Sequence, residues 1–376
     1  MTLLKNGRFF TATDPFNNNN IVEGIIFNSN DRYGDLLIKS VNGVSCEQYI
    51  HTTPKVFYPS DTISYPAYLN KIETNEFNLP DYDEVIVYNK YDGTNICLFS
   101  YKDAEGVIYR SFKTRLTPFL RPSLWGSWIE MWKRCMKNRP IDALISQHNI
   151  NFSFELYGYL NPILTEYKIP LDSVLLFGID NGEIIIPHEF VDKYSNIANI
   201  VYKFSKNDNF HFTYEELRSE MNKTIEREGY VVEGCVLYGI KDNKVVFVYK
   251  CKPDLILQNI RNSPNRIYKI SYKTIYNTCI NALESFNGGS LEDETIKLLK
   301  EEFTDETIER SKEVINKATK DIKKYLELRT EVLKWYKKQN YDKFIPKKVM
   351  PEAVKKFGKK LSTTIYKILS ETTFYE

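Results

Sequence analysis

The sequence has no long apolar run, few histidines and no paired cysteine motif. No segment approaches the roughly 18 consecutive apolar residues of a membrane-spanning helix, so no membrane partner is expected. The start, MTLLKNGRFFTATD, lacks the apolar core of a secretion signal. The six cysteines show neither CxxC nor Cys/His spacing, so no zinc site or disulfide framework is predicted. Such scattered thiols favour a reducing, cytoplasmic compartment.

Charges of both signs are plentiful, but they are unevenly distributed along the chain. The 376 residues carry a formal net charge of +2. Residues 255–376 contain 24 Lys or Arg against 17 Asp or Glu, a net charge of +7, which leaves −5 for residues 1–254. A basic segment suits a polyanion such as nucleic acid, and a solvated helical surface is the alternative explanation.

Strand patterns dominate up to residue 252. The β-branched and aromatic runs are bounded by Gly, Asn and Asp turns, and they predict short strands within 21–57 and further strands over 84–88, 95–101, 106–114, 150–158, 173–180, 182–187, 233–240 and 244–252. Apolar residues at spacings of three and four predict helical insertions over 123–138 and 213–228.

Helical patterns replace the strand patterns after about residue 255. We expect a helix over 304–338, with Thr304 as its N-cap. Its apolar stripe comprises Ile308, Ile315, Ala318, Ile322, Leu326 and Leu333. A second helix is expected over 351–371, with Pro351 in its first turn and Val354, Phe357, Leu361 and Ile365 buried.

Lys90 stands at the lip of a predicted strand turn, in YNKYDGTN, directly before Asp92 and Gly93. A lysine beside a turn is usually a solvated surface residue, and a nucleophilic amine at a pocket mouth is the alternative. Later strands carry Glu155 and Glu233 among apolar residues, which favours the second interpretation. Lys250 and Lys252 share one strand face, because residues two apart point the same way. Two cations so placed suit a phosphate between them.

Six short motifs occur in a fixed order between residues 88 and 252. The tetrapeptide Lys90–Gly93 resembles motif I (KxDG) of the covalent nucleotidyltransferases, the superfamily of ATP-dependent ligases and mRNA-capping enzymes. In order, SFKTR (111–115), FELYG (154–158), LLFGID (175–180), VEGCVL (232–237) and VYKCK (248–252) resemble motifs Ia, III, IIIa, IV and V. The chain is most similar to phage- and archaeal-type RNA ligases, because TPKVFYP (53–59) resembles their KFFN element and helices follow motif V.

The resemblance implies an α+β fold. An ATP-grasp-like nucleotidyltransferase domain of antiparallel sheets with flanking helices is expected over 1–254, including an N-terminal β-rich element over 1–80. A smaller all-α C-terminal domain is expected over 255–376, for RNA binding or specificity.

The resemblance also implies an ATP-dependent RNA ligase that uses Mg²⁺ or Mn²⁺ and joins RNA 5′-phosphate and 3′-hydroxyl ends. Lys90 would attack the α-phosphate of ATP and carry AMP, because an amine is a nucleophile only when neutral and neighbouring cations favour the neutral form. Lys250 and Lys252 would stabilise the phosphate charge. The expected catalytic residues are Lys90, Asp92, Lys250 and Lys252. The expected nucleotide-binding residues are Lys55, Lys90, Gly93, Asn95, Lys113, Arg115, Glu155, Phe177, Glu233, Lys250 and Lys252.

The sequence allows more than one role for several residues and more than one function for the protein. Phe177 could stack on adenine or belong to the core, and Lys113 and Arg115 could contact phosphate or be ordinary strand-edge charges. Glu23 stands where RNA ligases usually have arginine, which argues against a triphosphate contact there. The metal ligands cannot be assigned from the sequence. A DNA ligase, a guanylyltransferase and a catalytically silent RNA-binding relative are the rival functions.

Overall fold

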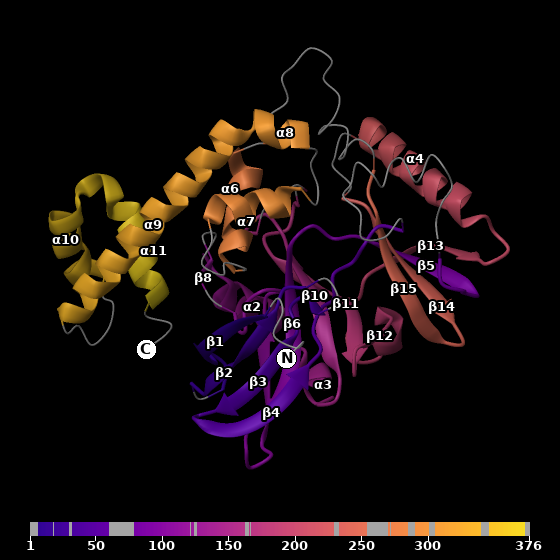
Figure 1. Cartoon of the computed structure of the whole chain (residues 1–376), viewed down its shortest axis with the longest axis horizontal. Coiled ribbons are helices and arrows are strands. Elements are labelled where there is room, and N and C mark those ends of the chain that lie inside the picture. Colours follow the sequence, from indigo (N-terminus) through magenta and orange to yellow (C-terminus); the bar gives the residue numbers. More distant parts are fainter. Residues whose placement is uncertain are drawn as a thin grey trace.

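The structure is a computed structural model. It describes residues 7–17, 19–29, 32–59, 79–120, 122–123, 126–161, 165, 167–228, 233–253, 270, 272–284, 290–300, 305–339 and 346–372. Three sheets of antiparallel strands form the body of the molecule, and the C-terminal part is helical (Figure 1). The predicted α+β class and the change from strands to helices are therefore confirmed. No helix in the described part of the chain is long and apolar enough to cross a membrane.

The N-terminal sheet is a meander of four strands in chain order. These are β1 (Gly7–Thr13), β2 (Ile21–Phe27), β3 (Leu36–Val41) and β4 (Val44–Ile50). The β3–β4 hairpin turns at Asn42 and Gly43, whose φ angles of 52° and 78° suit the two-residue turn that Asn-Gly favours. Strand β1 was not predicted from the sequence.

The central sheet has five strands in the order β12-β11-β10-β6-β7. Their bounds are β6 (Thr94–Lys102), β7 (Ile108–Lys113), β10 (Asn151–Tyr157), β11 (Asp172–Asp180) and β12 (Glu183–Ile185). The middle of strand β6, residues 96–99, is apolar because both faces of the strand are buried there. Ile96 and Leu98 pack against Trp132 in the helical layer, whereas Cys97 and Phe99 pack against the N-terminal sheet.

That helical layer is formed by α2 (Trp128–Asn138) and α3 (Asp142–Ile145), next to a small hairpin of β8 (Pro122–Ser123) and β9 (Gly126–Ser127). The helix predicted over 123–138 therefore begins later, at Trp128. Leu124 lies outside the described residues. A short 3₁₀ helix, η3 (Pro187–Phe190), follows β12.

A second sheet has the order β13-β5-β14-β15. It comprises β5 (Glu84–Asn89), β13 (Ile200–Ser205), β14 (Cys235–Lys241) and β15 (Lys244–Cys251). Helix α4 (Phe210–Glu228) covers one face, with Phe210 packing in a cluster with Val85. The other face meets the central sheet, where the Phe177 and Tyr238 ring centroids lie 6.4 Å apart. Edge strand β13 was not predicted, and three of its six residues are exposed.

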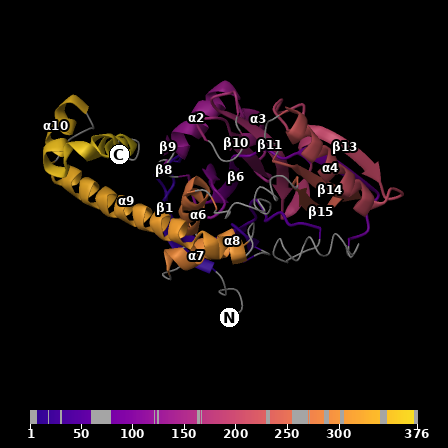
Figure 2. The same ribbon diagram turned by 90° about the horizontal axis from the view of Figure 1, so that it is seen from above.

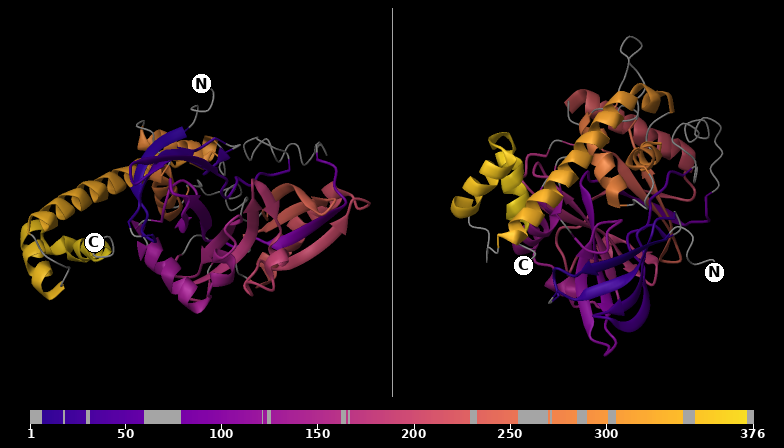
Figure 3. Two further views of the ribbon diagram at one scale, coloured as in Figure 1. Left: turned by 90° about the horizontal axis from the view of Figure 1, so that it is seen from below. Right: turned by 60° about the vertical axis from the view of Figure 1, so that its left-hand side comes forward.

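The C-terminal helices are α6 (Tyr272–Glu284), α7 (Leu291–Leu299), α8 (Asp305–Arg310), α9 (Lys312–Lys338), α10 (Pro346–Phe357), η4 (Lys359–Leu361) and α11 (Ser362–Thr372). They contain two separate cores. We define the proximal unit as residues 272–331, around Ile275, and the distal unit as residues 332–372, around Trp335. Figures 2 and 3 show α9 carrying the distal unit away from the proximal one.

Both long helices predicted in this region are interrupted. The helix expected over 304–338 breaks at Ser311, whose hydroxyl donates to the Thr307 carbonyl at 2.7 Å and accepts from the Ile270 amide at 2.8 Å. Thr304 lies outside the described residues. Leu326, expected in the apolar stripe, is 38% exposed.

The helix expected over 351–371 is two helices, because Gly358 has a φ of 100° and ends α10. Pro351 was wrongly placed in a first turn. Helix α10 begins at Pro346 instead, so Pro351 lies inside it and removes one helical hydrogen bond. Leu361, expected to be buried, is 37% exposed in η4.

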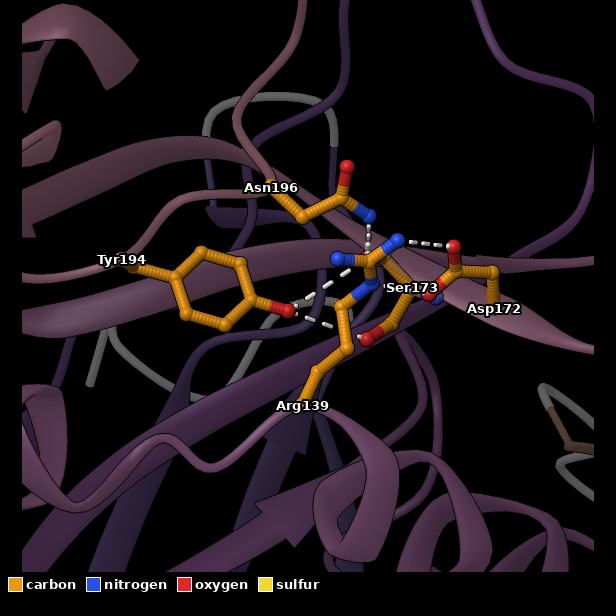
Figure 4. A network of polar contacts seen from close by, with 5 residues as sticks. All are labelled: Arg139, Asp172, Ser173, Tyr194 and Asn196. Atoms are coloured by element: carbon orange, nitrogen blue, oxygen red, sulfur yellow. Dashed lines mark hydrogen bonds and ion pairs between the residues drawn. The ribbon is translucent and has the colours of Figure 1, made fainter.

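A polar network fastens the end of α2 to the start of β11 (Figure 4). Arg139 donates from Nε and a terminal nitrogen to both oxygens of Asp172, at 2.7 and 2.8 Å. On the next residue, the Ser173 carbonyl accepts from the Asn196 amide, and its hydroxyl lies 3.3 Å from the Tyr194 hydroxyl. The network holds β11 in place beside β10, the strand that carries Glu155.

Replacing Arg139 with methionine should destabilise the protein by about 1–3 kcal/mol, because Asp172 is 16% exposed and would lose both hydrogen bonds. Urea unfolding measures the change. The control is Lys241→Met, which breaks an exposed pair with Asp81 and should change the stability much less, because solvent screens such a pair. Equal losses in the two variants would show that the Arg139 network does not fasten the sheet.

Candidate active site at the junction of two sheets

Three adjacent strands of the second sheet end at one edge, and this edge brings the charged residues of three motifs together. In the strand register Asn89 lies opposite Cys235, which lies opposite Cys251. Lys90 follows β5, Glu233 precedes β14 by two residues, and Lys252 follows β15. Register therefore gathers residues that lie more than 140 positions apart in the chain.

Glu233 binds two ammonium groups at this edge. Its Oε2 forms an ion pair with Lys90 Nζ, and its Oε1 lies 3.5 Å from Lys252 Nζ. The Glu233 and Lys252 side chains are 6% and 7% exposed, whereas that of Lys90 is 24% exposed. A buried carboxylate requires such partners. The accessible amine of this cluster is therefore that of Lys90.

Two glycines allow the backbones to approach closely enough for this arrangement. A Cβ on Gly93 would lie 2.1 Å from the Leu156 carbonyl oxygen, and a Cβ on Gly234 would lie 2.2 Å from the Cys251 carbonyl oxygen. Gly234 also has a φ of 141°. The Lys90 amide donates to the Gly234 carbonyl at 3.0 Å, which fixes the lysine beside the Glu233 segment.

Residues 90–93 carry the chain from the second sheet to the central sheet, whose site-facing side holds four predicted residues. Asn95 pairs with Glu155 in register, Lys113 pairs with Cys97, and Phe177 pairs with Ser153, which itself pairs with Cys97. Since directly opposite residues point to the same face, Asn95, Lys113, Glu155 and Phe177 share one side of the sheet.

Burial raises the pKa of Glu155 to about 7. The positive charges of Lys90 and Arg115 act against this rise, while the carboxylates of Glu233 and Asp92 add to it. These couplings show that the carboxyl of Glu155 lies within electrostatic range of the Lys90–Glu233 pair. At neutral pH this carboxyl can donate or accept a hydrogen bond.

Two buried polar atoms at the site have no hydrogen-bond partner among the described residues. They are Asn95 Oδ1 and Arg115 Nε. The Asn95 amide nitrogen is fixed, because it donates to Ser153 Oγ at 2.9 Å and to the Phe154 carbonyl at 3.0 Å. An acceptor and a cationic donor left open in this way fit a ligand with both polar and anionic groups, such as a nucleotide.

Lys113 binds backbone carbonyls and does not extend into the site as a phosphate contact would. Its side chain is fully buried, and Nζ donates to the carbonyls of Gly34 at 2.9 Å and of Arg115 at 2.8 Å. It therefore joins the connection between β2 and β3 to the backbone of Arg115. A Cβ on Gly34 would lie 2.5 Å from that same Arg115 carbonyl, so the two segments are in close contact.

Asp92 is buried and connects motif I to a neighbouring loop. One carboxylate oxygen accepts from the Thr165 amide at 2.6 Å, and the Asp92 amide donates to the Tyr167 hydroxyl at 2.8 Å. Sequence reasoning missed Tyr167, since no strand or motif pattern marks its loop. The structure reveals Tyr167 through its hydrogen bond with Asp92.

The segment around Lys55 lies along β15. The Lys250 amide donates to the Phe57 carbonyl at 2.9 Å, and Lys250 Nζ lies 4.5 Å from the centroid of the Tyr58 ring. Lys55 Nζ lies 5.7 Å from the Phe57 ring centroid. Thr53, also missed from the sequence, places its hydroxyl 3.0 Å from that of Ser153 on the site-facing side of the central sheet.

Two further predicted positions have clear placements. Phe177 is 2% exposed and packs in the core between the two sheets. Glu23 lies on β2 and accepts from the Ser40 hydroxyl at 2.8 Å. No three His, Cys, Asp or Glu side chains are grouped to hold a metal ion in the part of the chain that the structure describes.

Neither a family model nor a curated protein matches the chain. Among solved structures, an archaeal ATP-dependent RNA ligase is similar with a TM-score of 0.44 and 12% identity, covering 81% of this chain and 75% of that one. A protein from Aquifex aeolicus proposed to be an ATP-dependent DNA ligase gives 0.43 and 16%, covering 87% and 78%. A Naegleria gruberi RNA ligase variant with ATP and Mn gives 0.38 and 16%, covering 55% and 58%.

These proteins are of the class that the six motifs resemble, the ATP-dependent nucleotidyltransferases. All three TM-scores are below 0.5 and all three identities are at most 16%, so these similarities do not assign a function to this chain.

The pKa of Glu155 predicts a pH dependence of stability. Because its folded pKa of about 7 exceeds the usual 4.5, the folded protein binds the extra proton between these values. Stability should therefore fall as pH rises from about 5 to about 8, by at most about 3 kcal/mol from this group. Urea unfolding of wild type and Glu155→Gln at both pH values isolates the effect. The same pH dependence in both proteins would contradict the assignment.

Proposed function

We propose that this protein is an ATP-dependent RNA ligase in which Lys90 is the nucleophile. The observation that carries the proposal is the cluster of Lys90, Glu233 and Lys252 at the junction of the two sheets. A partly accessible amine beside a buried acid and a second cation suits attack on a phosphate. The order of the six motifs along the chain supports the same chemistry.

The first step would form a bond between Lys90 Nζ and the α-phosphorus of ATP. The bond from that phosphorus to the oxygen bridging to the β-phosphate breaks, and pyrophosphate leaves. Glu233 is placed to accept the proton that the ammonium of Lys90 must lose before attack. Lys252, on the far side of Glu233, would stabilise the charge that grows on the phosphate.

Three residues on, or directly after, strands of the central sheet would hold the rest of the nucleotide. The open Asn95 Oδ1 and the carboxyl of Glu155 suit the amino and hydroxyl groups of a nucleoside. Arg115 suits a phosphate, and Lys113 would position it by holding its carbonyl. Mg²⁺ or Mn²⁺ would enter with the phosphates and neutralise their charge, as such ions commonly bind through a substrate and few protein ligands.

In the second step AMP would pass from Lys90 to an RNA 5′-phosphate. In the third, an RNA 3′-hydroxyl would attack that phosphate, displace AMP and seal the strand. The RNA substrate is inferred from the similarity of motifs I to V to RNA ligases and from the helical C-terminal part. Domain boundaries at residues 254 and 255 belong to the same proposal.

The proposal is tested with labelled ATP and GTP, followed by nicked RNA and nicked DNA with 5′-phosphate and 3′-hydroxyl ends. Covalent label from ATP and sealing of RNA are expected. Label from GTP would indicate a guanylyltransferase, and preferential sealing of DNA would indicate a DNA ligase. A folded protein that takes up neither label would be a silent relative.

Lys90→Ala and Lys90→Arg should both lose covalent AMP labelling, because a guanidinium stays protonated and cannot attack. Autoradiography after denaturing electrophoresis measures the label. Thermal unfolding within a few degrees of wild type is the control for folding. Appreciable labelling of either variant would place the nucleophile elsewhere.

Lys252→Ala should reduce the rate of adenylylation by roughly 10²–10³-fold, the usual scale for loss of one preorganised charge. Lys250→Ala should also reduce it, since the motif places both lysines at the phosphate. Lys244→Ala is the matched control on the same strand. Its exposed pair with Glu183 lies at the opposite end of β15, so a change below about threefold is expected. Single-turnover labelling rates that are normal for Lys252→Ala would show that motif V is misplaced.

A further inference from the structure

The two units of the C-terminal region have opposite net charges. The proximal unit, residues 272–331, contains ten Lys or Arg and 13 Asp or Glu, a net charge of −3. The distal unit, residues 332–372, contains 11 lysines, no arginine and three acids, a net charge of +8. Residues 255–271 add only three Lys or Arg, so the distal unit carries most of the positive charge that the sequence shows after residue 255.

Helix periodicity places these lysines on the outside of the distal unit. On α9, Val332, Trp335 and Tyr336 face the core. Lys334, Lys337 and Lys338, which lie between and after them, are exposed, and further exposed lysines follow on α10 and η4. The nine exposed lysines are Lys334, Lys337, Lys338, Lys347, Lys348, Lys355, Lys356, Lys359 and Lys360.

Little negative charge balances this surface. None of the nine lysines belongs to a described ion pair, and Glu352 is the one acid among the residues whose side chains the structure describes in this unit. Like charges at this density repel one another and oppose packing of a small core. A counter-charge from a polyanion would remove that cost.

The residue type indicates how the polyanion would be bound. Lysine presents a point charge that suits phosphate oxygens, whereas arginine presents the planar fork used for bidentate readout of bases. A surface with nine exposed lysines, in a unit whose sequence has no arginine, fits sequence-independent contact with a phosphate backbone.

The position of the unit indicates which part of an RNA it would contact. In Figure 1 the distal unit lies at one end of the long axis, and the sheet of β13, β5, β14 and β15 lies towards the other. Helix α9 alone has 27 residues, or about 40 Å at 1.5 Å per residue. We therefore expect that a short oligonucleotide at Lys90 does not extend to these lysines.

We propose that the distal unit binds the phosphate backbone of RNA at a distance from the ends being joined, so that long RNA is held at two places. The proposal rests on the proposed function for the identity of the polyanion. Its consequence is that affinity depends on RNA length and on salt, while attack on ATP does not depend on this surface.

The test compares two variants of the full chain that change the charge equally. The first replaces Lys337, Lys348, Lys355 and Lys359 with glutamine. The control also introduces four glutamines, at Lys312, Lys320, Lys323 and Lys324, which are exposed on the proximal half of α9. Fluorescence anisotropy without ATP measures binding to a short oligonucleotide and to a stem-loop of about 20 base pairs, which at roughly 3 Å per pair exceeds the length of α9.

We expect the first variant to bind the stem-loop at least about tenfold more weakly at about 0.1 M salt. The slope of log binding constant against log salt concentration should be less steep by roughly 3–4. Binding of the short oligonucleotide and labelling by ATP should stay at wild-type levels, as should all properties of the control. Equal loss in both variants, or an equally large loss with the oligonucleotide, would overturn the proposal. A wild-type protein that binds the stem-loop through these lysines without taking label from ATP would instead contradict the ligase function.

Discussion

The carboxylate of Glu233, shared between Lys90 and Lys252, is the interaction on which the arrangement of the site depends. A carboxylate that is 6% exposed is costly to bury unless cations pair with it. The cations come from the ends of the neighbouring strands in the same sheet, β5 and β15. The register of the three strands therefore sets the charge balance of the site. A slip of β5 would remove Lys90 from Glu233, and a slip of β15 would remove Lys252.

Buried polar groups on the central sheet also need partners, and segments next to the N-terminal sheet supply them. Glu155, Asn95 and Ser153 form a polar row on the central sheet, and such a row requires hydrogen-bonding neighbours. Thr53 contacts Ser153, and Gly34 accepts from the buried amine of Lys113, which also holds the carbonyl of Arg115. The N-terminal sheet thus contributes to the shape of the site, although its own strands carry none of the six motifs.

The C-terminal region divides its charge between two units. Its proximal unit is slightly acidic and packs α6, α7 and α8 against the first half of α9. Its distal unit concentrates positive charge around an independent core at the far end of α9. This separation keeps a repulsive cluster of lysines away from the Lys90–Glu233 pair, where additional cations would compete for the same carboxylate.

The sequence by itself determined the α+β class, the strands that carry the motifs, and the group of charged residues around Lys90. These follow from local patterns, namely strand and helix periodicity and short motifs in a fixed order. Tertiary structure decided what those patterns could not express. The burial of Lys113, the break at Ser311, the position of Pro351 inside α10 and the contact between Thr53 and Ser153 each depend on residues distant in the chain. Such contacts are set by packing between elements, and local periodicity carries no information about them.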